Sequence, residues 1–288
     1  MTGWEPHAVT TAELVDPAPV AALAALFDNG LPAPRPGDDL PPLWHWVALP
    51  RWPVSSELGP DGHPARGSFL PPVDLPRRMF AGGEVTVHRA PRIGETVTRR
   101  SIVDSVTEKS GRSGKLVIVV VRTALSGVDG SPLVAERQDL IYREAGATTS
   151  GAAPVEPAEL ARTPFRRTEN GWDFATDPTL LMRFSAATAN PHRIHYDWPY
   201  ATRAEGYPGL VVHGPLMSLA LAEVLRLDSP GARVTRLAHR NLAPLFCGQP
   251  ARLRTEPRPG GAALTLVGDA GPRTSLEADY HEEGTLHA

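Results

Sequence analysis

The segment that decides the fold is LVVHGPLMSLALAEVLRLD, residues 210–228. Gly214 and Pro215 predict the start of a helix, because proline is favoured in the first helical turn. The helix that follows is apolar nearly all round, and only three polar residues interrupt it: Ser218, Glu223 and Arg226. A helix of this composition is buried on all sides, so the segment predicts a helix at the centre of a domain.

Segments typical of β-strands follow this helix. They are rich in β-branched residues, have short connections and cover residues 232–246, 251–259, 262–271 and 273–284. Four earlier segments share this character, with the turn signals PRIGE, SGRSGK and VDGS between them; they cover residues 84–90, 95–109, 115–130 and 133–144. The run PVAALAALFD, residues 19–28, predicts a helix before them. Helices and then an antiparallel meander in each half predict an α+β protein whose sheets curl around helices.

The chain is expected to divide near its middle. Residues 147–155 are small or proline and show no period, which is typical of a linker. We therefore expect a first domain over residues 1–146 and a second over residues 156–288. The proline- and tryptophan-rich residues 31–79 predict a long ordered loop within the first domain.

The composition excludes several classes of protein. The 288 residues carry a net charge of −3 with a pI near 6.4, so no basic excess favours nucleic acid or an anionic membrane. No apolar run approaches the roughly 18–20 residues of a membrane span, and the first residues do not resemble a secretory signal. The single cysteine, Cys247, excludes an intramolecular disulfide. A cytoplasmic location is the expectation.

A second informative segment is FSAATANPHRIHYDWPYA, residues 184–201. His195 lies in a loop beyond a helix that Pro191 ends. A histidine between apolar neighbours is suited to act as a general base, because its ordinary pKa lies near neutrality. Asn190 is placed to hold a water molecule, and Asp197 to orient an imidazole ring. The segment therefore predicts a site that transfers protons.

Two other interpretations of this segment remain open. His192 and His195 are equally compatible with partly buried side chains that bond to the backbone. A metal site is the weaker alternative, because His192, His195 and Asp197 offer three ligands but no closed coordination set. We expect no metal.

The segment VVHGPL, residues 211–216, adds a second polar feature. The first N–H groups of a helix are unpaired and carry positive potential. Gly214 would let a substrate approach the backbone closely, and Pro215 has no N–H of its own. Such a helix start is suited to polarise a carbonyl group, although a Gly-Pro start without any function has the same sequence.

These two segments resemble the hydratase motif of the MaoC-like, hot dog-fold enoyl-CoA hydratases and 3-hydroxyacyl-thioester dehydratases. Phe184 takes the place of the motif's aromatic residue, Ile194 and His195 that of its Ile-His, and Asp197 that of the acid that follows. The segments FLPPVDLPRRMFAGGEV, RIGETV, VTEKSGRSGKL and EGYPGLVVHGPL resemble the two-domain branch of that family. This branch contains mesaconyl-CoA and itaconyl-CoA hydratases and type 2 hydroxyacyl-thioester dehydratases. The resemblance covers nearly the whole chain.

The resemblance implies a double hot dog fold, with two α+β domains side by side. It implies reversible hydration of a 2-enoyl-CoA, or dehydration of a 3-hydroxyacyl-CoA, with a short, branched or dicarboxylic acyl group. No metal or redox cofactor is implied. Two double hot dog chains are expected to form a homodimer.

The resemblance also implies roles for single residues. His195 is the expected base, Asn190 the water holder and Gly214 the donor of the N–H that polarises the thioester. The supporting residues are His192, Asp197 and His213. The expected substrate-binding residues are Arg193, Tyr196 and Pro215. The arginines expected to meet phosphates are Arg77, Arg78, Arg112 and Arg193. The first half is expected to shape the acyl pocket without a His/Asp group of its own.

One position departs from the family pattern. The catalytic aspartate of the family falls on Asn190 and its asparagine on His192. An amide cannot ionise, so Asn190 is expected to position the water while His195 takes the proton. The departure leaves two alternative functions, a non-catalytic acyl-CoA-binding protein and an acyl-CoA thioesterase. A thioesterase needs a group that activates water at the carbonyl, which Asn190 does not supply.

Overall fold

The computed structural model of the chain describes residues 3–111, 114–144, 160–161 and 163–282. The first half supplies the strands β1 (Ala8–Leu14), β2 (Arg77–Val87), β3 (Thr96–Gly111), β4 (Gly114–Gly127) and β5 (Pro132–Arg143). The second half supplies β6 (Phe165–Thr168), β7 (Gly171–Phe174), β8 (Ala232–Asn241), β9 (Ala251–Arg258), β10 (Gly261–Gly268) and β11 (Gly271–Glu282). The predicted linker lies outside the described residues, so the domain boundaries stay predictions.

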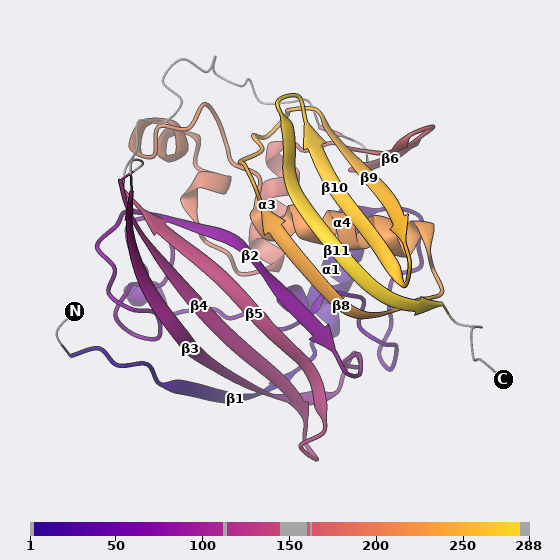
Figure 1. Cartoon of the computed structure of the whole chain (residues 1–288), viewed down its shortest axis with the longest axis horizontal. Helices are drawn as coiled ribbons and strands as arrows, with labels where there is room; N and C mark the ends of the chain where they lie inside the picture. The colour runs from indigo at the N-terminus through magenta and orange to yellow at the C-terminus, as the bar shows by residue number, and fades with distance from the viewer. Residues whose placement is uncertain (1–2, 112–113, 145–159, 162, 283–288) are drawn as a thin grey trace.

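Within the described ranges these strands form one antiparallel sheet, in the order β1-β3-β4-β5-β2-β8-β11-β10-β9-β7-β6 (Figure 1). The order repeats itself around the pairing of β2 with β8. Outward from that pairing lie β5, β4 and β3 on one side, and β11, β10 and β9 on the other. Two similar sheets therefore lie side by side, as predicted, and share a continuous hydrogen-bonded ladder.

Two glycines allow close contact at this junction. A Cβ atom on Gly82 would lie 2.4 Å from the carbonyl oxygen of His239, and one on Gly83 would lie 2.0 Å from that of Arg137. Any side chain at either position would displace a neighbouring strand, so the sequence GG of β2 fits the point where the two halves join.

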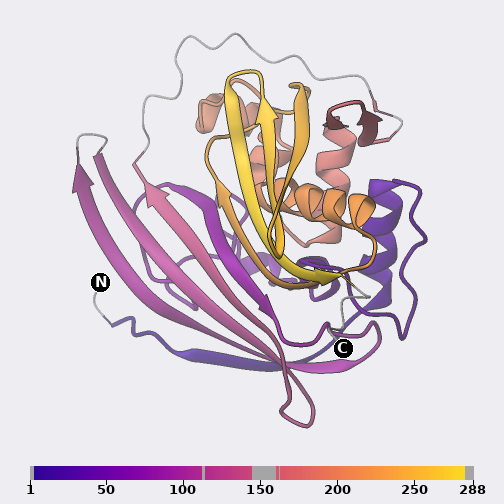
Figure 2. The same cartoon turned by 45° about the vertical axis from the view of Figure 1, so that its right-hand side comes forward.

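The helices gather on one face of the sheet (Figures 1 and 2). Helix α4 (Gly214–Asp228) contacts the four long strands of the second half and also β2. Every residue from Leu216 to Leu225 is buried, which confirms the predicted central helix. Helix α1 (Pro17–Phe27) packs against α2 (His45–Ala48) and α3 (Pro178–Ala187), so the helices of the two halves share one apolar core. None of the described helices is long and apolar enough to span a membrane.

Three short strands were not predicted from the sequence. β1 pairs with β3 at one end of the sheet, and β7 with β6 extends the other. In β1, half-buried and exposed residues alternate along AVTTAEL, a weak signal because no residue of the strand is fully buried. β6 and β7 have four residues each, too few for a period to appear in the sequence.

Candidate active site

The loop that carries the predicted site follows α3. Asp177 caps this helix by accepting the N–H groups of Thr179 and Leu180 at 2.7 and 3.0 Å. The helix ends at Ala187, before the left-handed residue Ala189 (φ 49°). The end of the helix before Pro191 is therefore confirmed, and the chain is free to turn toward α4.

His195 lies at the centre of the site with only 6% of its surface exposed. Its Nδ1 lies 2.7 Å from the carbonyl oxygen of Val211. Because a carbonyl can only accept, Nδ1 carries the proton, and Nε2 is left with a free lone pair. Burial lowers the pKa of His195 to about 3, so the ring is neutral near pH 7. A neutral ring with a free Nε2 can accept a hydrogen from water.

His213 stacks on His195, with ring centroids 3.6 Å apart. Its Nε2 lies 2.8 Å from Oγ of Ser185, while its Nδ1 is buried without a partner in the part of the chain that the structure describes. Burial and the nearby His195 and His192 lower the pKa of His213 well below its usual value. His213, predicted as a supporting residue, thus lies directly against the ring of the expected base. Its role stays a prediction.

The start of α4 lies beside these rings, but it differs from expectation in one respect. A Cβ atom on Gly214 would lie 2.7 Å from Nδ2 of Asn241, an amide that donates to the carbonyl oxygen of Phe80 at 2.9 Å. The side chain of Asn241 fills the space in the Cβ direction of Gly214, so a substrate would have to approach this backbone from another side, and the role of Gly214 stays a prediction. Gly214 and Leu216 supply the N–H groups of the first helical turn, which have no partner within a helix.

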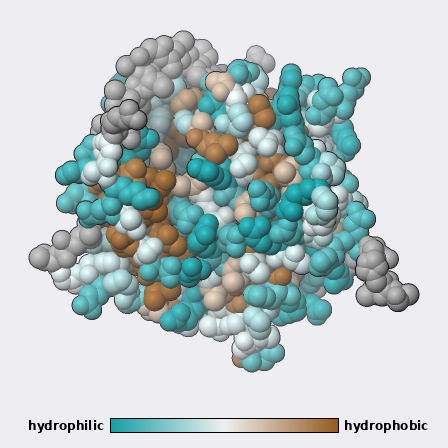
Figure 3. Space-filling model, in the orientation of Figure 1, coloured by the Kyte–Doolittle hydropathy of each residue, from teal (hydrophilic) through white to brown (hydrophobic). Residues whose placement is uncertain are grey.

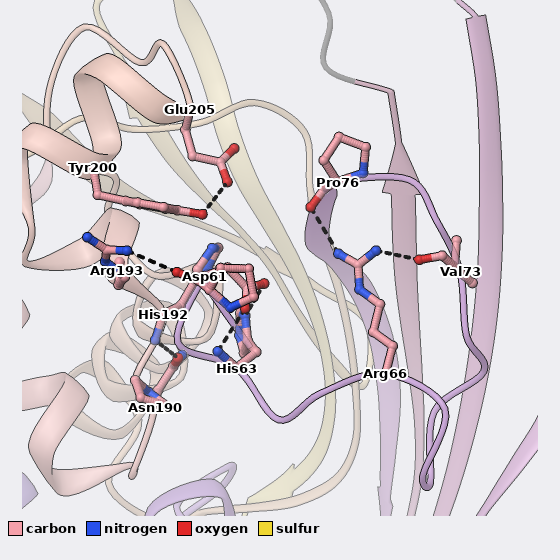
Figure 4. A network of polar contacts seen from close by, with 12 residues as sticks. Asp61, His63, Arg66, Val73, Pro76, Asn190, His192, Arg193, Tyr200 and Glu205 are labelled. Atoms are coloured by element: carbon pink, nitrogen blue, oxygen red, sulfur yellow. Dashed lines mark hydrogen bonds and ion pairs between the residues drawn. The ribbon is translucent and has the colours of Figure 1, made fainter. Parts of the chain in front are cut away.

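The structure contradicts the expectation that the first half brings no His/Asp group. The loop between residues 59 and 67 places Asp61 and His63 against His192 (Figure 4). The rings of His63 and His192 lie 4.2 Å apart, and those of His192 and His195 lie 5.4 Å apart. Asp61 Oδ2 lies 3.3 Å from Nδ1 of His63. The site is therefore built from both halves of the chain.

Hydrogen bonds to its backbone carbonyl groups hold this loop on the second half. Arg193 donates its N–H to the carbonyl oxygen of Asp61 at 3.0 Å and its Nη1 to that of Pro60 at 3.0 Å. Gly62 has a φ of +90°, and a Cβ there would lie 2.0 Å from the carbonyl oxygen of Pro191. The other end of the loop is tied to the first half by Arg66, which donates to three carbonyl groups at residues 73–76 (Figure 4).

Burial, together with nearby positive charge, keeps the rings of His63 and His192 neutral. Burial lowers the pKa of His63 to about 4, and the guanidinium of Arg78 adds to this effect. Burial, with the positive charge of a protonated His63, also lowers the pKa of His192. Burial alone would raise the pKa of Asp61, but its hydrogen bond with His63 and the nearby histidines outweigh that and lower it. Near neutral pH the site holds neutral histidines and an ionised carboxylate.

Asp61, His63 and His192 also offer three ligand atoms within 4.8 Å of one another, a grouping found once among the described residues. It differs from the metal alternative drawn from the sequence, which used His192, His195 and Asp197. That alternative is wrong, because Asp197 accepts both Nε and Nη2 of Arg193, at 3.0 and 2.8 Å. One carboxylate and two histidines are ligands that a metal ion such as Zn²⁺ accepts. Any role proposed for these three residues therefore needs a control with a chelator.

Several other predicted roles change because the side chains already have partners within the loop. Asp197 does not orient an imidazole, because its carboxylate binds Arg193 and the N–H of Tyr200. The guanidinium of Arg193 is committed to Asp197, to Pro60 and to the ring of Tyr200, which lies 4.2 Å below it. Tyr196 is exposed and donates its hydroxyl to the carbonyl oxygen of Pro191. Arg193 and Tyr196, both predicted to bind substrate, therefore stabilise the loop itself. The predicted role of Pro215 stays a prediction.

The four arginines expected to meet phosphates have different environments. Arg77 pairs with Glu205 at 3.5 Å, and Arg193 is bound as described above. Arg112 lies outside the described residues. Arg78 is half-buried near His63 and beside the hydroxyl of Tyr142, and no described carboxylate lies within ion-pair distance of it. Arg78 is thus the member of the set whose charge acts on a histidine of the site.

The comparisons with known proteins agree with this fold. HtdX of Mycobacterium tuberculosis has a similar structure, with a TM-score of 0.64 and 21% identity, covering 96% of this chain and 100% of that one. A conserved M. tuberculosis protein described as having a double hotdog fold matches with a TM-score of 0.56 over 97% of this chain and 96% of that one. The predicted double hot dog fold is therefore confirmed.

Sequence similarity then defines the family. The family model for hydroxyacyl-thioester dehydratase type 2 matches residues 43–247. The mesaconyl-C(4)-CoA hydratase of Chloroflexus aurantiacus is 44% identical over 91% of this chain and 90% of that protein. The mitochondrial hydroxyacyl-thioester dehydratase type 2 of Schizosaccharomyces pombe is 26% identical over 85% and 89%. The chain belongs to the type 2 hydroxyacyl-thioester dehydratase family, and the prediction of a hydro-lyase acting on acyl thioesters is confirmed.

Proposed function

We propose that the chain catalyses the reversible hydration of a short 2-enoyl-CoA of the mesaconyl-CoA type. The observation that carries this proposal is the neutral, buried His195, whose Nδ1 is fixed on Val211 and whose Nε2 is free. The 44% identity with a mesaconyl-C(4)-CoA hydratase over most of both chains supports the choice of acyl group.

The reaction adds the oxygen of water to the β-carbon and a proton to the α-carbon of the thioester. His195 Nε2 accepts a hydrogen bond from the water and makes its oxygen more nucleophilic. As the oxygen bonds to the β-carbon, negative charge develops on the thioester carbonyl. The N–H of Gly214, at the positive end of α4, stabilises that charge. Asn190 accepts the N–H of His192 at 3.1 Å and so keeps the loop in place beside the water.

The test is an assay of the purified chain against a panel of enoyl-CoA thioesters that includes mesaconyl-C4-CoA and crotonyl-CoA, with products identified by mass spectrometry. We expect a mass gain of one water on at least one thioester. His195→Ala is expected to lower kcat about 10²- to 10⁴-fold, the range for loss of a general base, with an unchanged circular dichroism spectrum. A near-normal kcat in this variant would show that His195 has no role in the reaction.

The same assay separates the alternative functions. A thioesterase would release free CoA thiol, and a non-catalytic acyl-CoA-binding protein would bind the thioester without turnover. A thioesterase is not favoured, because it needs a group that activates water at the carbonyl. Asn190 is an amide, and it is committed to His192. A neutral histidine with a free Nε2 beside a helix start is the arrangement that hydration uses.

A cytoplasmic homodimer is also part of the proposal. Leu116, Ile118 and Val120 of β4 are half-buried and lie on the face of the sheet opposite the buried Val117, Val119 and Val121. Figure 3 shows apolar side chains gathered over this half of the sheet. Such a face is suited to pair with the same face of a second copy. The single cysteine, Cys247, is free and buried, which suits a reducing compartment.

A further inference from the structure

The reaction calls for two polar groups on the catalytic water, and one of them is missing at the position predicted from the sequence. His195 supplies the first. The family motif places an aspartate where this chain has Asn190, and an amide can neither take up nor release a proton at neutral pH. Any carboxylate that serves this reaction must therefore come from elsewhere, and Asp61 lies beside the site histidines.

We propose that Asp61 and His63 of the first half form the second proton-transfer group of the active site. The inference rests on the proposed hydration. Asp61 Oδ2 lies 3.3 Å from Nδ1 of His63, and Asp61 Oδ1 accepts the N–H of His63 at 3.0 Å. An ionised carboxylate only accepts, so Nδ1 of His63 carries the proton and Nε2 keeps a free lone pair. His63 and His195 therefore have the same tautomer, and each is fixed by an acceptor on Nδ1.

The position of His63 is set by rigid contacts with the second half. Its ring lies 4.2 Å from that of His192, which in turn lies 5.4 Å from that of His195. The peptide N–H of Arg193 donates to the carbonyl oxygen of Asp61, which joins the two loops. The side chain of His63 is 12% exposed and that of Asp61 16%, which leaves the pair accessible to a substrate but largely shielded from water.

The carboxylate of Asp61 favours His63 over His195 as the acceptor of a full proton, and the guanidinium groups of Arg78 and Arg66 act against it. The groups that face His63 are Asp61 on its own loop, Arg66 and Arg78 from the first half, and His192 from the second. Asp61 stabilises a positive charge on His63 directly. His195 has no carboxylate within ion-pair distance among the residues that the structure describes, and Asp197 is occupied by Arg193. An imidazolium at His195 would be buried against His213 without a counter-ion.

The step balances with a single proton in motion. Water first donates one hydrogen bond to Nε2 of His195 and another to Nε2 of His63. Its oxygen bonds to the β-carbon, the C=C π bond breaks, and the water proton facing His63 moves to Nε2 of that ring. The imidazolium, paired with Asp61, then releases this proton to the α-carbon, and both histidines end neutral. The hydrogen held by His195 remains on the product hydroxyl.

The first test compares His63→Ala and Asp61→Asn with His88→Ala, an exposed histidine of the first half that serves as control. We expect kcat to fall about 10²- to 10⁴-fold for His63→Ala and by a smaller factor for the isosteric Asp61→Asn, while His88→Ala keeps wild-type kcat. Added imidazole should restore part of the turnover of His63→Ala. If His63→Ala fails to fold, Asp61→Asn carries the test.

The second test returns the carboxylate of the family motif. Asn190→Asp introduced into His63→Ala should recover kcat at least about tenfold, because an aspartate there is a proton acceptor. The proposal is overturned if kcat of His63→Ala or Asp61→Asn stays within about threefold of wild type, or if neither imidazole nor Asn190→Asp restores turnover. It is also overturned if EDTA abolishes wild-type turnover and Zn²⁺ restores it, since the three residues would then hold a metal. Wild-type turnover itself tests the proposed function separately.

Discussion

Asn190 shows how one side chain can replace an acid without taking over its chemistry. Its Oδ1 accepts the N–H of His192 at 3.1 Å, and its own N–H donates to the carbonyl oxygen of Ser185 at 2.9 Å. These two bonds define the turn that carries the chain from α3 toward His195. An aspartate could form the same turn, because a carboxylate oxygen accepts an N–H as well as an amide oxygen does.

This geometry gives opposite predictions for two substitutions at one position. Asn190→Asp keeps the acceptor and is expected to keep kcat within several-fold of wild type. Asn190→Ala loses the acceptor, so His192 is held less firmly; we expect kcat to fall about tenfold to a thousandfold and stability to fall by about 1 kcal/mol. Both values come from steady-state kinetics and thermal unfolding of the same samples. A lowered melting temperature with unchanged kcat in Asn190→Ala would mean that this residue stabilises the turn and has no role in the reaction.

The sequence predicted the residues of the second half because they lie close together along the chain. Asn190, His192 and His195 lie within six positions, and Gly214 starts a helix with a recognisable Gly-Pro signal. Asp61 and His63 are more than a hundred residues away, in a loop without periodicity. The signal was the glycine between them, which suits a tight turn. Only the contacts of that turn with Pro191, His192 and Arg193 reveal that it belongs to the site.

Among the elements, the long strands and the buried helix were predictable, and the edges of the sheet were not. Valine-rich β4 alternates over many residues, and α4 is apolar nearly all round, so both patterns are visible in the sequence. β6 and β7 have four residues each, and pairing of β7 with β9 and of β6 with β7, rather than local preference, gives them their structure. The same limit applies to the loop of residues 59–67, whose conformation depends on the second half.

The docking of that loop can be tested with a matched pair of glycines. Gly62 and Gly94 both have a φ of +90°, but a Cβ on Gly94 would meet nothing within 4 Å, whereas one on Gly62 would lie 2.0 Å from the carbonyl oxygen of Pro191. Gly94→Ala is expected to cost about 1–2 kcal/mol for the left-handed conformation alone. Gly62→Ala must also displace the loop, so it should cost more and lower kcat at least about tenfold.

Urea unfolding and steady-state kinetics on both variants give the comparison. Equal losses of stability, with kcat unaffected in each, would mean that the loop is not needed where it lies. A larger loss confined to Gly62→Ala would assign the difference to the contact with Pro191, since the backbone strain is shared.

At the scale of the whole molecule, the site lies where the two halves meet, and this concentrates buried histidines in one region. Burial lowers the pKa of His63, His192, His195, His213 and His239 in the folded protein. In the unfolded chain the pKa of each returns to about 6.5. The folded state therefore binds fewer protons than the unfolded state at mildly acidic pH. This difference links the architecture of the site to the stability of the chain.

The sign of the pH dependence follows directly. Above pH 6.5 these rings are neutral in both states and have no effect on folding. As the pH falls below 6.5 the unfolded chain takes up protons first, so the free energy of unfolding decreases by up to about 1.4 kcal/mol per pH unit for each histidine. The decrease continues to about pH 4 for His63 and His239, and to about pH 3 for His195, where the folded protein also takes up the proton. We expect a steep loss of stability between pH 6.5 and 4.5.

Urea unfolding at pH 7.5, 6.5, 5.5 and 4.5 measures this slope, and His239 offers a way to assign it. His239 lies on β8, with Nδ1 3.3 Å from Oγ of Ser218 and no described partner for Nε2, and it is not part of the reaction. His239→Gln removes one titrating ring, so the slope below pH 6.5 should shrink by up to about 1.4 kcal/mol per pH unit, whatever its effect on stability at pH 7.5. An unfolding free energy that is constant from pH 6.5 to 4.5, or a slope unchanged in His239→Gln, would contradict the burial of neutral histidines on which the site is built.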